Sequence, residues 1–176
     1  MKRIGLLSDT HGHLDPRIKK YFDEVDEIWH AGDIGPEAVT DQLALWKPLR
    51  AVYGNIDDHR ARLQFPEDLL LEVEGLRVFI THIGGYPGKY PARIKAKLNQ
   101  YQPGLFICGH SHILRVMPDP IFKLLHINPG AAGNHGFHKV KTLVRFAIDQ
   151  GKVKELQVIE LGPRSTDFSE IGVEGA

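Results

Sequence analysis

The chain has 176 residues, of which 22 are basic and 22 acidic, so its formal net charge is zero. Zero net charge excludes an overall electrostatic field that would attract a nucleic-acid polymer or an anionic membrane. The length fits one domain over residues 1–176 with a loosely held tail after about residue 163, and the single cysteine, Cys108, indicates a reducing, cytoplasmic location.

Short apolar runs alternate with segments of helical period over the first hundred residues, a pattern typical of α/β proteins. Strands are expected over residues 3–7, 27–30, 49–53, 69–73, 77–81 and 105–108. Helices are expected over residues 16–22, with Asp15 as N-cap, and over residues 36–46 and 91–101. The apolar run near the N-terminus is too short for a signal peptide, and no run is long enough for a membrane helix.

The last third of the chain changes character. Strands are expected over residues 113–117, 123–127, 142–148 and 153–161. A turn at residues 149–151 joins the last two as a hairpin. We therefore expect this part of the sheet structure to be antiparallel.

Five of the expected strands end in aspartate, asparagine or histidine. In an open α/β sheet the carboxyl ends of the strands gather along one edge, where ligands bind. We therefore expect the side chains that follow these strands to converge. These side chains are Asp9, His11, Asp33, Asn55, His82, His110 and His112.

The local spacing supports this convergence. In an extended segment residues i and i+2 point the same way, so Asp9 with His11, and His110 with His112, are each expected to act as a pair. Glycines at positions 32, 54 and 109 precede the ligands, and we expect them to leave room for the backbone to turn.

This donor set indicates the kind of ion. Carboxylate, amide and imidazole donors without a thiolate suit manganese, iron, zinc or nickel better than calcium or a structural cysteine-bound zinc. The set is too large for one ion and suits two ions roughly 3.5–4 Å apart that share a carboxylate. Each short motif alone is more typical of a turn, but together they predict a metal site, because burying so many ionisable groups without an ion is costly.

The motifs Asp-x-His, Gly-Asp, Gly-Asn, Thr-His and Gly-His-x-His, in that order, resemble the signature of calcineurin-like metallophosphoesterases. The resemblance covers residues 1 to about 130. The short length and segment 126–133 make the chain similar to the compact YfcE/MJ0936-type phosphodiesterase branch, to which Vps29 is related. The resemblance implies an α/β fold, a four-layer αββα sandwich of two mixed sheets flanked by helices.

The resemblance also implies how the ligands divide. One ion would be held by Asp9, His11 and His112, and the other by Asn55, His82 and His110, with Asp33 as the bridge. The implied reaction is hydrolysis of a small phosphodiester by hydroxide activated by two divalent ions, with manganese favoured and iron, zinc or nickel as alternatives. We assign Asp33, Asn55 and His82 as catalytic, since the Asn55 amide can both ligate an ion and donate to a phosphate oxygen.

The sequence departs from the family pattern at Ile56, because larger relatives have a histidine there that assists departure of the leaving group. The proton donor is thus open, with His59 as one candidate. Asp57 is a candidate for orienting a ligand histidine. His135 and His138 are expected to be solvated.

Two other functions compete with the phosphodiesterase. A Vps29-like non-catalytic scaffold that binds protein partners is the main alternative, although such scaffolds lose site histidines and this chain keeps them. A nuclease of the Mre11 type is disfavoured by the zero net charge, so no strong binding of nucleic-acid polymers is expected. A small nucleotide or cyclic phosphodiester is favoured over a polymer as the substrate. The physiological substrate, the native metal and formation of a homo-oligomer are left open by the sequence.

Overall fold

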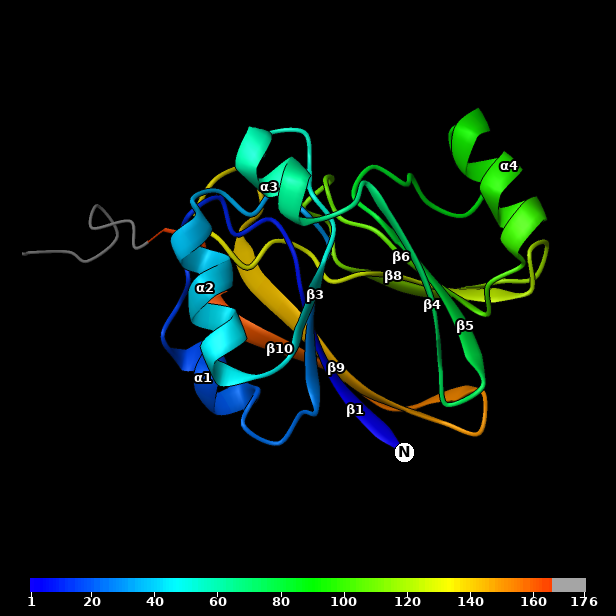
Figure 1. The fold of residues 1–176 in the computed structure, drawn as a ribbon, viewed down its shortest axis with the longest axis horizontal. Helices are drawn as coiled ribbons and strands as arrows, with labels where there is room; N and C mark the ends of the chain where they lie inside the picture. The colour runs from blue at the N-terminus through cyan, green and yellow to red at the C-terminus, as the bar shows by residue number, and fades with distance from the viewer. Residues whose placement is uncertain (166–176) are drawn as a thin grey trace, which may run out of the picture.

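Two five-stranded sheets pack face to face in the computed structural model, which describes residues 1–165 (Figure 1). The first sheet contains β1 (Lys2–Leu7), β2 (Glu27–His30), β3 (Leu49–Ala51), β9 (Val140–Asp149) and β10 (Lys152–Pro163). Its strand order is β10-β9-β1-β2-β3. Strands β1, β2 and β3 run parallel, whereas β9 is antiparallel to β1 and to β10, so the sheet is mixed.

The second sheet is also mixed. It contains β4 (Asp68–Val73), β5 (Leu76–Thr81), β6 (Leu105–Ile107), β7 (Arg115–Asp119) and β8 (Leu124–Asn128). Their order is β4-β5-β6-β8-β7. The expectation that the last third is wholly antiparallel is wrong here, because β8 pairs in parallel with β6. The more fully buried β8 takes the inner position, and the alternately exposed β7 takes the edge.

Helices cover the outer faces of both sheets. Helices α1 (Arg17–Tyr21) and α2 (Glu37–Trp46) lie beside the first sheet, and α4 (Ala92–Tyr101) lies beside the second (Figure 1). Two buried residues on α4, Ile94 and Leu98, are one helical turn apart, which gives the helix one apolar face. The predicted four-layer αββα sandwich is therefore confirmed.

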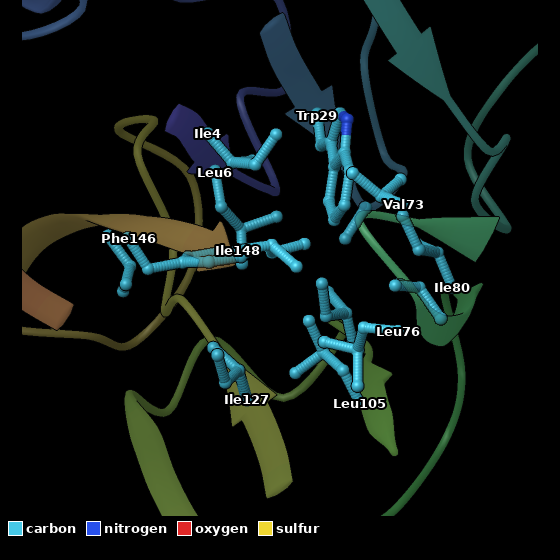
Figure 2. Close-up of a cluster of buried hydrophobic side chains, with 14 of the residues drawn as sticks. Ile4, Leu6, Trp29, Val73, Leu76, Ile80, Leu105, Ile127, Phe146 and Ile148 are labelled. Carbon is cyan, nitrogen blue, oxygen red and sulfur yellow. The ribbon is translucent and has the colours of Figure 1, made fainter. Parts of the chain in front are cut away.

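The largest buried cluster lies between the two sheets (Figure 2). Ile4 and Trp29 from the first sheet meet Ile80 and Ile127 from the second, and all four are fully buried. Sandwiched sheets bury apolar side chains between their inner faces. This core fixes the relative position of the strand ends that carry the candidate ligands.

The boundaries differ from the prediction at some points. Helix α1 begins at Arg17 with Pro16 as its N-cap, so the prediction of Asp15 as N-cap is wrong by one residue. The Asp15 carboxylate still accepts the Arg17 amide at 2.9 Å. Helix α3 (His59–Gln64) was not predicted, since none of its residues is buried and it shows no apolar period.

The predicted loose tail after about residue 163 lies almost entirely outside the described residues, so the assignment of residues 1–176 to one domain stays a prediction. Within residues 1–165, no helix combines the length and apolar character needed to cross a membrane.

Candidate metal centre

The predicted ligands gather at the carboxyl ends of the strands in two groups. The first group is Asp9, His11 and His112, and the second is Asp33, His82 and His110. Within each group, the ligand atoms all lie within 4.8 Å of one another. Each group combines residues that follow strands of the first sheet with residues that follow strands of the second. The site is therefore built across the sandwich.

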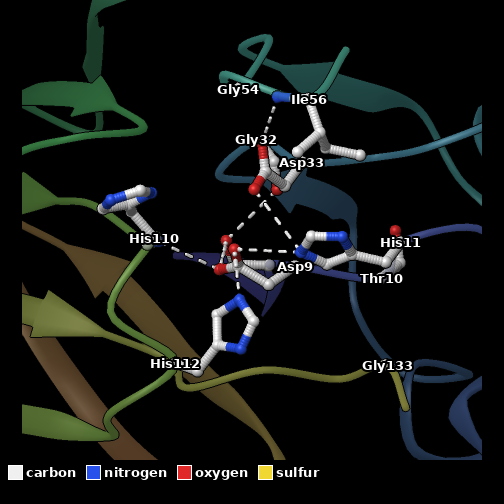
Figure 3. A network of polar contacts seen from close by, with 12 residues as sticks. Asp9, Thr10, His11, Gly32, Asp33, Gly54, Ile56, His110, His112 and Gly133 are labelled. Carbon is white, nitrogen blue, oxygen red and sulfur yellow. Dashed lines mark hydrogen bonds and ion pairs between the residues drawn. The ribbon is translucent and has the colours of Figure 1, made fainter. Parts of the chain in front are cut away.

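Asp33 belongs to the second group and also faces His11 of the first group (Figure 3). One of its carboxylate oxygens is 3.2 Å from His82 Nε2, and the other is 3.4 Å from His11 Nε2. In the first group, His112 Nε2 is 3.1 Å from Asp9 Oδ1. A carboxylate whose two oxygens face different groups has the geometry needed to bridge two ions.

Asn55 approaches the second group through His110. Its Oδ1 lies 3.0 Å from His110 Nδ1, and the Asn55 side chain is exposed beside this group. The Asn55 amide can therefore contact both a ligand histidine and a molecule that is bound beside the second group. All seven predicted residues thus lie at one end of the sandwich.

Three buried atoms of the site have no hydrogen-bond partner: Asp9 Oδ1, His11 Nε2 and His82 Nε2. Buried polar atoms are nearly always paired, so three unpaired atoms at one point indicate that something else satisfies them. His82 Nδ1 lies 2.8 Å from the carbonyl oxygen of Ala31, to which it must donate. In the neutral imidazole, Nε2 then carries a lone pair that faces the centre, as a metal ligand requires. These donors fit divalent cations.

The charges at the site are strongly coupled. Burial opposes ionisation of Asp9 and Asp33, but contacts with the surrounding histidines hold the pKa of both carboxyls below the usual range. Burial opposes protonation of His82 as well, yet Asp33 and Asp9 raise the pKa of its imidazole. Carboxylates that stay ionised while buried are suited to binding a cation.

The backbone at five of the ligands is left-handed, which is uncommon for residues other than glycine. The φ angles are 54° at Asp9, 45° at His11, 54° at Asp33, 70° at His110 and 60° at His112. The expectation of extended ligand pairs is therefore wrong. Asp9 and His11 still meet, but His110 and His112 point to different groups because the chain turns sharply between them.

The glycines before the ligands make room for side chains that come from neighbouring strands. A Cβ at Gly32 would stand 2.6 Å from His82 Nδ1, and one at Gly54 would collide with the Asp33 carboxylate. A Cβ at Gly109 would collide with the side chains of Ser8 and Asp9, which follow β1. The glycine positions thus allow segments that are distant in sequence to approach closely.

Asp57 supports two ligand loops through their backbones. Its carboxylate accepts the amides of Ile34 at 2.9 Å, Gly35 at 3.0 Å and Gly54 at 2.7 Å. It thereby links the loop after β2 to the loop after β3. The expectation that Asp57 orients a ligand histidine is wrong, because it contacts backbone amides instead.

The buried side chain of His30 is neutral, and each of its ring nitrogens has a hydrogen-bond partner. Its Nδ1 accepts the Gly32 amide at 3.1 Å, and its Nε2 lies 3.0 Å from the Thr10 hydroxyl. Burial lowers the pKa of His30 to about 4. It therefore ties the loop after β1 to the loop after β2, as expected for a histidine beside the ligands.

Asn128 is a supporting residue that sequence reasoning missed. Its side-chain amide donates to the Gly109 carbonyl at 2.9 Å and to the Ser111 hydroxyl at 3.0 Å. These contacts hold the turn that presents His110. The segment Asn128-Pro129-Gly130 has the composition of a turn, but this composition does not indicate the partners of the Asn128 side chain.

His135 and His138 were expected to be solvated, and for His138 this is wrong. The exposed His135 ring lies 4.7 Å from the His11 ring, between centroids. The His138 ring is half-buried at 5.2 Å from His112, and its Nε2 donates to the Gly133 carbonyl at 2.8 Å. Both side chains border the centre. By contrast, His59 is exposed at the first turn of α3.

Comparison with known proteins agrees with this geometry. The model of the calcineurin-like phosphoesterase superfamily domain matches residues 1–151. The phosphodiesterase MJ0936 of Methanocaldococcus jannaschii is 32% identical over 145 residues, which cover 73% of this chain and 82% of that protein.

Solved structures of similar fold include an archaeal phosphodiesterase, with a TM-score of 0.74 and 24% identity over 90% of this chain and 99% of that one. They also include Vps29 from Chaetomium thermophilum, with a TM-score of 0.71 and 17% identity over 92% of this chain and 97% of that one. At these sequence identities, the similarity to the two solved structures shows the fold alone. Together with the family match, these results confirm the predicted branch and enzyme class, and the chain belongs to the calcineurin-like phosphoesterase superfamily.

Proposed function

We propose that the protein is a metal-dependent phosphodiesterase that hydrolyses small phosphodiesters at a dinuclear centre. The observation that carries this proposal is the pair of ligand groups that the Asp33 carboxylate connects, with unpaired buried atoms on Asp9, His11 and His82. The likeness to a curated phosphodiesterase supports the choice of diesters.

The centre would hold two divalent ions. Asp9, His11 and His112 would hold one, Asn55, His82 and His110 would hold the other, and Asp33 would bridge them. When bound, such ions lower the pKa of water so that hydroxide exists near neutral pH, and they neutralise charge on the phosphoryl oxygens. Manganese is the ion we favour, since the donors are nitrogen and oxygen without sulfur, and iron, zinc or nickel suit the same set.

The chain's own residues would orient the substrate. The Asn55 side chain is exposed and offers an NH2 group that can donate to a phosphoryl oxygen, which an aspartate at this position could not do. The Ile56 amide donates to Asp33 Oδ1 at 3.1 Å and keeps that carboxylate turned toward the centre. Asp33, Asn55 and His82 are therefore the residues to which we assign catalysis.

The proposal is tested by incubating purified protein with manganese and bis-p-nitrophenyl phosphate, beside an Asp33→Asn variant. We expect metal-stimulated release of p-nitrophenol by the wild type and at least a hundredfold less by the variant, because losing one ligand of a shared centre removes most of the transition-state stabilisation. Metal content after gel filtration should fall from two equivalents to below one. Equal release by the two proteins would contradict the proposal.

A non-catalytic scaffold is the second candidate, favoured by the likeness of fold to Vps29. Retention of all seven candidate ligands argues for the enzyme instead. Recovery of a stable protein complex from lysate, together with less than one equivalent of bound metal, would support the scaffold.

Nucleic-acid polymers are disfavoured as substrates, because the chain carries no net charge. A salt-sensitive gel shift with duplex DNA at low micromolar protein would overturn this part of the proposal.

A further inference from the structure

Three apolar side chains are exposed beside the candidate metal centre. Ile56 is 46% exposed, Ile113 is 56% exposed and Phe137 is fully exposed. All three line a single open cleft of about 490 Å³, whose wall also contains Asp33 and Asn55. Single exposed apolar residues are common on protein surfaces, but several that face the same concave site indicate a binding surface.

These side chains come from three separate parts of the chain. Ile56 follows β3 in the first sheet, Ile113 follows β6 in the second sheet, and Phe137 lies in the segment that precedes β9. The same turns that present candidate ligands present two of them, since Ile56 follows Asn55 and Ile113 follows His112. The apolar wall is therefore fixed in position relative to the centre.

The charge of this cleft is also distinctive. Among the described residues that line it, none is lysine or arginine, and the polar lining consists mainly of histidines. Arg164, which lies beside the cleft, donates to the backbone carbonyls of His138 at 3.0 Å and Asn134 at 3.3 Å. Arg62 and Arg93 line a second cleft, which shares Asn55 with the first. There Arg93 is paired with Asp68 at 2.8 Å, and Arg62 donates to the Asp57 carbonyl at 2.9 Å. The apolar cleft thus offers no cation outside the metal centre for a second phosphate.

We propose that this cleft receives an aromatic or aliphatic ester group of the substrate, which makes apolar phosphodiesters with a single negative charge the preferred class. This inference rests on the proposed function. An apolar ester group would bury surface against Ile56, Ile113 and Phe137, whereas an additional anionic group would lose its hydration without gaining a partner. In the reaction, a water oxygen bonds to phosphorus and the bond from phosphorus to the leaving ester oxygen breaks. One of the water protons ends on that oxygen, which gives an alcohol or phenol and a phosphate monoester.

Calorimetric binding to the manganese-loaded protein tests the assignment with three probes. Diphenyl phosphate is apolar, dimethyl phosphate lacks the rings, and bis(4-carboxyphenyl) phosphate keeps the rings but adds charge. We expect diphenyl phosphate to bind at least tenfold more tightly than either of the others, because a hydrophobic contact of this size discriminates by about 10- to 200-fold.

Variants of the residues that line the cleft test whether the cleft causes the preference for diphenyl phosphate over dimethyl phosphate. In Phe137→Ser and Ile113→Ser the ratio of the diphenyl to the dimethyl affinity should fall about fivefold or more. The matched control is Ile121→Ser, which removes an isoleucine that is 79% exposed in the turn between β7 and β8 and should leave the ratio unchanged.

Failure of this inference is distinguishable from failure of the proposed function. Suppose that the protein hydrolyses bis-p-nitrophenyl phosphate in the presence of manganese. Equal affinities for the three probes, or an unchanged ratio in the cleft variants, would then overturn the assignment of the cleft but not the proposed phosphodiesterase activity. Absence of any metal-dependent turnover would overturn the proposed function, and with it the role of the cleft as a substrate pocket.

Discussion

At His110 the backbone is left-handed, with a φ of 70°, and the side chain is exposed. For a residue with a Cβ this conformation costs roughly 1–2 kcal/mol. Five candidate ligands share this conformation, so their backbone strain lowers the stability of the fold. The surrounding structure must therefore hold these residues in place. Strain of this kind is concentrated at functional sites.

A pair of substitutions at His110 measures this cost. We expect His110→Gly to be more stable than His110→Ala by about 1 kcal/mol, because only glycine adopts the left-handed conformation without a steric penalty. Both variants lose the imidazole, so the difference isolates the backbone. Urea unfolding in the presence of a chelator gives the free energies. Equal stability of the two variants would show that the left-handed backbone is not strained here.

Asp57 offers a test of how the loops hold the ligands. Asp57→Asn should destabilise the fold by about 1–3 kcal/mol, since an amide cannot accept all the backbone amides that the carboxylate accepts. The metal affinity should fall about 10- to 100-fold, because the loops that carry Asp33 and Asn55 lose their common anchor. The measurements are thermal unfolding and manganese titration.

The control for this prediction is the neighbouring Asp58, whose carboxylate caps α3 by accepting the Ala61 amide at 3.0 Å. Asp58→Ala should cost about 1 kcal/mol of stability without weakening metal binding. If both variants lose metal to the same extent, Asp57 has no special role in positioning the ligands.

The candidate ligands could be predicted from the sequence because each follows an apolar strand, and strand order brings such positions to one edge. The contacts of their supporting residues could not. Asp57 was a candidate for support, but its backbone partners were not predicted, and Asn128 and His138 act through contacts that only the tertiary fold creates. The separation of His110 from His112 depends on φ angles, which residue spacing does not report.

At the scale of the elements, strands were predictable where apolar runs were continuous, and helices where an apolar face repeats, as on α2 and α4. Helix α3 was not predicted because it buries no residue, so its sequence has no apolar period. The parallel pairing of β8 with β6 was not predicted for a different reason. The pairing of β7 with β8 follows from their closeness in the sequence. Which of the two also pairs with β6 depends on which strand is more apolar, and this cannot be read from the turn between them.

Glu27 connects three strands of the first sheet at one point. Its carboxylate lies 2.8 Å from Lys2 Nζ on β1 and 2.8 Å from Arg50 Nε on β3, and it accepts the Trp29 indole N–H at 3.0 Å. Burial opposes its ionisation, but these partners lower the pKa of Glu27 to about 2. The ionised form is therefore favoured by folding.

This pKa predicts how stability depends on pH. The stabilisation from Glu27 should be fully present above about pH 4.5 and should be lost as the pH falls toward 2, since the folded pKa lies below the unfolded value. Glu27→Gln should cost about 1 kcal/mol at pH 7, less than the full shift implies, because Lys2 and Arg50 are partly exposed and screened by solvent.

The difference between wild type and Glu27→Gln should shrink in urea unfolding at pH 3 relative to pH 7. Glu160→Gln, which changes an exposed glutamate on β10, should show no such pH dependence. A difference that grows on acidification would contradict the assignment.

At the scale of the whole molecule, each ligand group contains residues from both sheets, so a bound ion would link the two halves of the sandwich. A ligand that binds only the folded state stabilises it by about 2.7 kcal/mol at a hundred times its dissociation constant. For a chain of this length that corresponds to a rise in melting temperature of roughly 5–10 °C.

Differential scanning fluorimetry with manganese and with a chelator measures this rise, and Asp33→Asn should reduce it to near zero because both groups depend on that carboxylate. A full rise in the Asp33→Asn variant would place the bound ions elsewhere.

Strand β1 lies between β2 and β9, and its residues 2–6 pair with residues 144–148 of β9. During synthesis, this edge of β1 must remain open until residues 144–148 have emerged from the ribosome. Pairings this distant in sequence form slowly, and an open edge invites association with other chains. The emerging protein therefore carries Asp9 and His11 beside a strand that is still unpaired on one side, and this open edge follows from pairing β1 with a strand so distant in the sequence.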